Sequence, residues 1–169
     1  MFDYRLAMSI NSQKTSKGVA TQFDMQGQLS VDSLKSWVPE IISSKLKGKT
    51  EFQALLNLGS GSDNELQILS DLKGIEVNLP QPFTKLAKHK SPFSFNLTLA
   101  EPQRPILHYD DKFAYNLLFK DRGYESGTIT LGDRRVASQN NPGIEVVGTL
   151  DEFDFQQWRE ILESSTPPN

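Results

Sequence analysis

Histidine is scarce and cysteine is absent in this chain, and the side chains able to do acid-base or metal chemistry match no catalytic pattern in their spacing. The two histidines, His89 and His108, are far apart and belong to no HExxH or HxH spacing, so we do not expect a metal site. His89 lies among lysines and is expected at the surface. His108 falls in an apolar stretch, residues 106–109, where a histidine is more typical of a cross-strand or rim position than of a general base.

Carboxylates are the remaining candidates for chemistry. A hydrolase acting on envelope glycans would need two converging acids, and the sequence offers Glu101, Asp110, Asp121 and Glu125. Adjacent acids such as Asp110 and Asp111 would point to opposite faces of a strand, and in a turn they would stay solvated. No GxSxG serine motif, phosphate-binding glycine loop or cysteine nucleophile is present. We therefore expect a protein that is not an enzyme, with no catalytic residue, no metal site and no cofactor.

Composition limits the possible partners. With 169 residues the chain is long enough for a single domain with a substantial core. Its 18 basic and 21 acidic residues give a net charge of −3 without long runs of one sign, which argues against nucleic acid as a partner. No cysteine is present, so disulfides and thiolate metal sites are excluded. There is neither a membrane-spanning apolar stretch nor a signal-peptide pattern. If the protein works outside the cytoplasm, we expect its targeting segment to lie beyond these residues.

Strict alternation of apolar and polar residues dominates the sequence and is typical of half-buried strands. It occurs in residues 2–10, 19–25, 52–58, 93–99 and 113–119. A further run from Leu66 changes phase at Lys73 and Gly74, where we expect a bulge. The proline-bounded basic segment 80–92 is expected as a solvated crossover loop, with contact to a lipid headgroup or an acidic partner as the alternative. The pattern as a whole predicts about nine strands separated by Gly, Asp, Asn and Ser turns.

One sequence motif occurs twice, at a constant offset of 121 positions. The matched pairs are Gly27 with Gly148, Leu29 with Leu150, Ser33 with Asp154, Leu34 with Phe155, Trp37 with Trp158 and Ile41 with Leu162. Each copy, residues 27–46 and 148–164, predicts a strand end, an N-cap at Ser33 or Asp154, and an apolar helical stripe. We expect helices over 33–46 and 154–163, although Pro39 should kink or split the first. A repeat of this kind is typical of one unit in an array.

The fold class is therefore mainly β: a curved antiparallel sheet with two short helices at matched positions. Two sheets could close as a sandwich, which would suit a lectin-like binding or scaffold module of the cell envelope. Alternatively, one sheet could curl into a groove or open barrel that accepts an apolar ligand. Alternation alone gives the candidate lining residues of such a groove: Phe52, Leu56, Phe93, Phe95, Leu97, Phe113, Tyr115 and Leu117.

Three stretches of the sequence resemble a known family. Residues 72–85 read LKGIEVNLPQPFTK, residues 127–132 read GTITLG, and residues 143–158 read GIEVVGTLDEFDFQQW. Together they resemble the repeating part of the large YhdP-type AsmA-like proteins of Gram-negative bacteria, over residues 26–162. Departures are modest: Ile75 and Phe83 stand where leucine is common, and Ser33 where aspartate is usual.

The resemblance implies a single β-rich repeat-unit domain, residues 1–169, of a larger protein with an inner-membrane anchor and a long periplasmic region. It implies a non-catalytic role in phospholipid transport to the outer membrane and in envelope integrity, through an apolar β-groove. Phospholipid acyl chains and neighbouring repeat units of the same chain are then the expected partners. Exposed strand edges would also permit homo-association.

Overall fold

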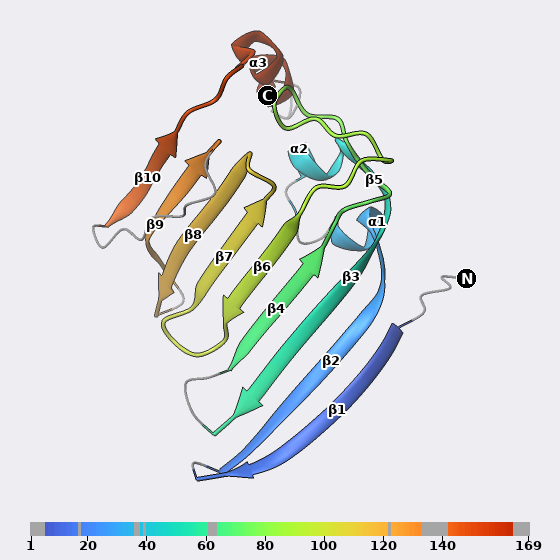
Figure 1. The fold of residues 1–169 in the computed structure, drawn as a ribbon. Coiled ribbons are helices and arrows are strands. Elements are labelled where there is room, and N and C mark those ends of the chain that lie inside the picture. Colours follow the sequence, from blue (N-terminus) through green and yellow to red (C-terminus); the bar gives the residue numbers. More distant parts are fainter. Residues whose placement is uncertain are drawn as a thin grey trace.

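The computed structural model of this protein describes residues 6–16, 18–35, 38, 40–60, 64–121, 123–132 and 142–163. Within those ranges it contains ten strands and three short helices (Figure 1). The strands are β1 (Leu6–Thr15), β2 (Gly18–Ser30), β3 (Leu46–Gly59), β4 (Glu65–Ser70), β5 (Ile75–Val77), β6 (Phe93–Thr98), β7 (Arg104–Tyr109), β8 (Phe113–Lys120), β9 (Gly123–Leu131) and β10 (Gly143–Gly148). The helices are α1 (Val31–Leu34), α2 (Glu40–Ser43) and α3 (Phe155–Glu163).

Nine of the strands lie side by side in one open sheet, in the order β1-β2-β3-β4-β6-β7-β8-β9-β10, and β5 pairs with the start of β3. Every described pair is antiparallel except the last, in which β10 runs parallel to β9. The predicted curved antiparallel sheet is therefore confirmed for all pairs but one. A parallel pair needs a long connection rather than a tight hairpin, and residues 132–142 provide that length. The described strands form one open sheet and not a closed sandwich.

Strand register gathers most of the apolar residues onto one face, because directly opposed residues of paired strands share a face; Leu55, Leu69 and Ile106 are exceptions on the other face. One unbroken row crosses all nine strands: Met8, Met25, Ala54, Ile68, Phe95, Leu107, Tyr115, Ile129 and Val146. We call this set the central row, and the side of the sheet that carries it the apolar face. The next row on the opposite side is mostly polar and includes Asp24, Gln67, Asn96, Asn116 and Glu145. The sheet is therefore amphipathic.

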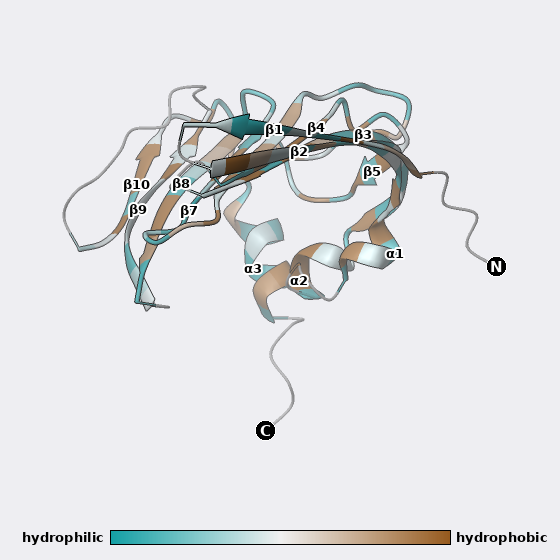
Figure 2. Ribbon diagram, turned by 90° about the horizontal axis from the view of Figure 1, so that it is seen from below, coloured by the Kyte–Doolittle hydropathy of each residue, from teal (hydrophilic) through white to brown (hydrophobic). Residues whose placement is uncertain are grey.

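Figure 2 shows the sheet arching over the side on which the three helices lie. That side is the apolar face, because α1 packs there at one end of the strands: Val31 forms a buried cluster with Ile75 and Val77, against Leu46 and Leu72 among others. The helices thus close one end of the apolar face and leave the rest open. No helix in the described part of the chain is long and apolar enough to cross a membrane.

The first predicted helix is wrong in extent. Instead of one helix over 33–46, two single-turn helices form, and β3 already begins at Leu46. The first is capped by Ser30, whose hydroxyl accepts from the Asp32 N–H at 3.3 Å, rather than by Ser33. A proline at position 39 cannot donate a backbone hydrogen bond, and it disfavours helix at the residue before it, which explains the interruption. Trp37 and Pro39 themselves lie outside the described residues.

The second predicted helix is confirmed as α3, so three helices are present in the described ranges instead of two. Its predicted N-cap is also confirmed, since Asp154 Oδ1 accepts from the Gln157 N–H at 3.0 Å. The helix is attached through Trp158, which meets Phe83 edge-on at 5.8 Å and stacks on Phe153 at 6.4 Å between ring centroids. Its own Ile161 is buried.

Candidate functional site

All eight predicted lining residues lie on the apolar face. Register places Phe95 and Tyr115 in the central row, and the others lie in the rows on either side of it. None of the eight is fully buried, and none is fully exposed. Each therefore keeps part of its surface available to a ligand. The residues of this set are Phe52, Leu56, Phe93, Phe95, Leu97, Phe113, Tyr115 and Leu117.

The apolar face extends further than the predicted set. Leu107 and Ile129 join Phe95 and Tyr115 in the central row, although neither was among the predicted lining residues. The sequences around Leu107 and Ile129 also alternate between apolar and polar residues. These short stretches contain a histidine, a proline or threonines, so the alternation in them was less clear. At the two sheet edges the face is widely exposed: the exposed fraction is 56% for Met8 and 59% for Val146. A contiguous exposed apolar surface is typical of binding sites.

Tyrosines place hydroxyls among these apolar side chains. Tyr115 contacts Phe113 edge-on at 6.1 Å, and burial raises the pKa of its hydroxyl. Burial, and to a smaller extent the charge of Asp110, raises the pKa of Tyr109 to about 12. A hydrogen bond with Ser91 lowers this pKa and offsets part of the rise. The Tyr109 hydroxyl donates to the Phe83 carbonyl at 3.2 Å, at the end closed by the helices. Both phenols are therefore neutral at physiological pH and add no charge to the face.

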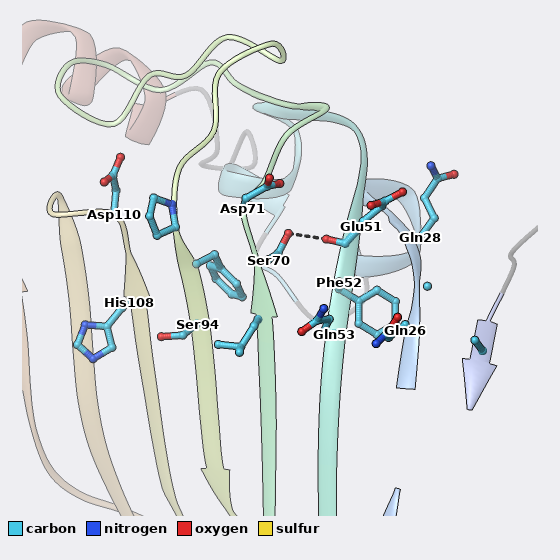
Figure 3. Close-up of a pocket in the computed structure, with 15 residues that line it drawn as sticks. Gln26, Gln28, Glu51, Phe52, Gln53, Ser70, Asp71, Ser94, His108 and Asp110 are labelled. Atoms are coloured by element: carbon cyan, nitrogen blue, oxygen red, sulfur yellow. Dashed lines mark hydrogen bonds between the residues drawn. The ribbon is translucent and has the colours of Figure 1, made fainter. Parts of the chain in front are cut away.

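The opposite side of the sheet carries a separate hollow of about 1080 Å³, lined mainly by polar side chains (Figure 3). Phe52 and Phe93 also border it, although register places their side chains on the apolar face. The labelled residues around it are Gln26, Gln28, Glu51, Phe52, Gln53, Ser70, Asp71, Ser94, His108 and Asp110. A lipid chain would find no continuous apolar lining in this hollow, so it is a poorer candidate for lipid than the apolar face.

The four candidate carboxylates of a glycan hydrolase are not gathered in one place. Asp110 lies in the turn from β7 to β8, at one end of the sheet. Glu101 lies between β6 and β7 and Asp121 follows β8, both at the other end, and both are exposed. Glu125 is exposed near the start of β9. His108 occupies a cross-strand position between Ser94 and Ala114, as expected. In the described ranges, no three His, Asp or Glu side chains come together as metal ligands.

Lys85 is the residue that sequence reasoning missed. The basic segment 80–92 was expected to be solvated, and Lys88, His89 and Lys90 are indeed exposed, but Lys85 is only 4% exposed. Its ammonium donates to the carbonyls of Leu72 and Ile75, both at 2.7 Å, and more weakly to that of Leu86 at 3.3 Å. The only sequence signal was its place at the end of the apolar, proline-bounded stretch 72–85.

These bonds hold the predicted bulge between β4 and β5. The chain turns there through Leu72 and Gly74, which have positive φ angles of 50° and 96°. A Cβ at Gly74 would stand 2.1 Å from the Lys49 carbonyl oxygen, so only glycine fits. Backbone bonds between Val77 and Lys85, at 2.9 Å in both directions, tie the following loop to β5. Lys85 therefore organises the turn beside which α1 packs and the apolar face ends.

Comparison with known proteins gives one match. A family model described as "YhdP protein" matches residues 1–168 of the chain. No curated protein and no solved structure matches it.

Proposed function

This chain belongs to the YhdP family, and we propose that its apolar face carries phospholipid acyl chains between the membranes of a Gram-negative envelope. Membership of the family suggests an envelope-related protein of the lipid-transport type. In this proposal the chain is a non-catalytic, periplasmic segment of an inner-membrane-anchored protein. Neighbouring units of the same protein would extend its sheet on either side.

The central row is the observation that carries the proposal. It crosses nine strands spaced about 4.8 Å apart, so the apolar path is roughly 40 Å long. This length exceeds the roughly 15 Å of one leaflet, half the hydrocarbon thickness of a bilayer. No charged residue interrupts the row. A chain on this path stays in contact with apolar side chains from one edge of the sheet to the other.

The energetics need no headgroup-specific contact. A chain of about sixteen methylenes gains on the order of 10 kcal/mol when it is removed from water, at about 0.8 kcal/mol for each methylene. The paired strands satisfy their own backbone hydrogen bonds, so a lipid next to them meets few unpaired polar groups. On β2 to β7 the opposite face is mostly polar and can stay in water while the apolar face holds the chain; on β9 its small polar residues, such as Thr128 and Thr130, are buried.

Photo-crosslinking at two adjacent positions tests the proposal. Leu97 and Asn96 are neighbours on β6 but lie on opposite faces, so they form a matched pair. A photoreactive amino acid at position 97 should capture phospholipid in the periplasm of living cells, and one at position 96 should not. The proposal is refuted if position 97 and a second apolar position, Tyr115, capture no lipid, or if position 96 captures as much as they do.

A further inference from the structure

One hydroxyl group on the apolar face has no partner among the described residues. In the central row and the row on either side of it, the described strands place only three polar side chains, Ser70, Tyr109 and Tyr115. The Ser70 hydroxyl donates to the Glu51 carbonyl at 2.7 Å, and the Tyr109 hydroxyl donates to the Phe83 carbonyl at 3.2 Å. The Tyr115 hydroxyl makes no hydrogen bond with any described residue.

Tyr115 stands in apolar surroundings near the middle of the sheet. It lies in the central row between Leu107 of β7 and Ile129 of β9, and its ring meets Phe113 edge-on. Burial alone raises the pKa of its hydroxyl, which therefore stays a neutral donor. The side chain is half-buried, and its hydroxyl is not among the polar atoms sealed from solvent. Water can therefore satisfy this donor while the face is empty.

A lipid on the apolar face would displace that water. A hydroxyl that loses water without gaining an acceptor weakens binding, because its desolvation is not compensated. A hydrocarbon chain offers no acceptor, whereas an ester-linked acyl chain carries a carbonyl oxygen at its head. An ester carbonyl placed at Tyr115 restores the lost hydrogen bond, and the methylenes can follow the apolar rest of the row, which needs no acceptor.

Distances along the central row indicate which way such a chain runs. Tyr115 is on the seventh of nine strands, so at about 4.8 Å a strand roughly 10 Å of path remain toward Val146 and roughly 29 Å toward Met8. One leaflet of a bilayer is roughly 15 Å thick, so a full acyl chain fits only on the β1 side. Three strand spacings, from Tyr115 to Ile68, span about 14 Å. A chain with its ester at Tyr115 would therefore cover β7, β6 and β4.

We propose that Tyr115 determines the specificity of the lipid path: its hydroxyl donates to the ester carbonyl of an acyl chain that runs from β8 toward β4. This inference rests on the proposed function and adds a ligand class, ester-linked lipids, and an orientation, with the headgroup toward β9 and β10.

Two phospholipids that differ only in their linkage test the ester contact. Dihexanoyl phosphatidylcholine carries ester carbonyls, and its diether analogue carries none. NMR titration of the unmodified chain with each lipid, below its micelle concentration, gives two dissociation constants. We expect the ester lipid to bind about tenfold more tightly, and Tyr115→Phe to bring this ratio below about twofold by weakening the ester lipid alone.

A matched control and a spin label complete the experiment. Tyr124→Phe removes a hydroxyl that already donates to the Gly143 carbonyl at 2.9 Å, so it should leave the ratio unchanged. Tyr115→Phe should keep the wild-type Tm, because the hydroxyl it removes has no partner in the described part of the protein. A phosphatidylcholine with a nitroxide near the end of a palmitoyl chain should broaden the amide signal of Ile68 more than that of Val146.

The possible failures can be told apart. Equal affinity of the two lipids for the unmodified chain refutes the ester contact and leaves the proposed function standing. Equal weakening of both lipids by Tyr115→Phe overturns it as well, since the acceptor would then be the phosphate that both lipids share. Stronger broadening at Val146 than at Ile68 refutes the orientation. Binding of neither lipid overturns the proposed function together with this inference.

Discussion

Replacing Lys85 by methionine tests how strongly the turn beside the apolar face depends on one ammonium group. The substitution keeps an unbranched side chain of similar length and removes the charge and all three donated hydrogen bonds. The carbonyls of Leu72 and Ile75 would lose partners that now stand at 2.7 Å. Because Lys85 is almost fully buried, water cannot replace those bonds without opening the turn.

The expected cost follows from these contacts. A hydrogen bond to a charged group contributes about 1.5–3 kcal/mol, and two of the three bonds are short. Relief from the desolvation of a buried ammonium offsets part of that loss. We therefore expect Lys85→Met to lower the free energy of unfolding by about 3 kcal/mol. For a chain of this size that corresponds to a fall in Tm of roughly 6–12 °C.

Urea and thermal unfolding followed by circular dichroism would measure the change. Lys88→Met is the matched control, because Lys88 is an exposed lysine of the same loop, and its effect should stay within about 0.5 kcal/mol. The reasoning is refuted if the two variants are equally stable, since the buried ammonium would then hold nothing that water or methionine cannot replace.

The same variant should also change the pH dependence of stability. Desolvation lowers the pKa of Lys85 below its ordinary value of 10.5. The charge of Asp71 raises this pKa, and the charge of Lys112 lowers it further. Between the lowered pKa and 10.5 the unfolded chain binds more protons than the folded one, so this residue makes stability rise with pH in that window. Lys85→Met should lack that rise when the two proteins are compared in the alkaline range.

Three further predictions concern the face and its closed end. Leu97→Asp puts a charge on the apolar path. With the photoreactive probe at position 115, it should reduce phospholipid capture at least tenfold. The control Asn96→Asp, on the opposite face, should leave the capture unchanged. Tyr109→Phe should cost about 1 kcal/mol through the lost bond to the Phe83 carbonyl. Since the pKa of Tyr109 is raised to about 12, wild-type stability should fall as pH rises above 10, and urea titrations should show a smaller fall in the variant. Trp158→Ala should release α3 at a cost of about 2 kcal/mol, visible as faster amide exchange in that helix.

Much of the strand content could be predicted because alternation is a local property. A period of two assigns residues such as Phe93, Phe95 and Leu97 to one face whatever the neighbouring strand is. The α3 cap at Asp154 was equally local, since it needs only a side chain and the next turn of backbone. The first helix was less predictable, because its helical stripe conflicts with the proline inside it and the structure places the cap at Ser30.

The sequence by itself therefore determined which residues of each strand face the same way and where one helix begins. It also determined that one sequence motif recurs after 121 positions. Only the tertiary structure decided how the strands align across the sheet, because register depends on pairing between residues far apart in the chain. That alignment joins nine separate alternations into one unbroken apolar row. The tertiary structure also decided that β10 pairs with β9 in the parallel direction. It likewise decided that Lys85 is buried against the carbonyls of Leu72 and Ile75. No local pattern contains these contacts, because each needs a partner brought close only by the fold.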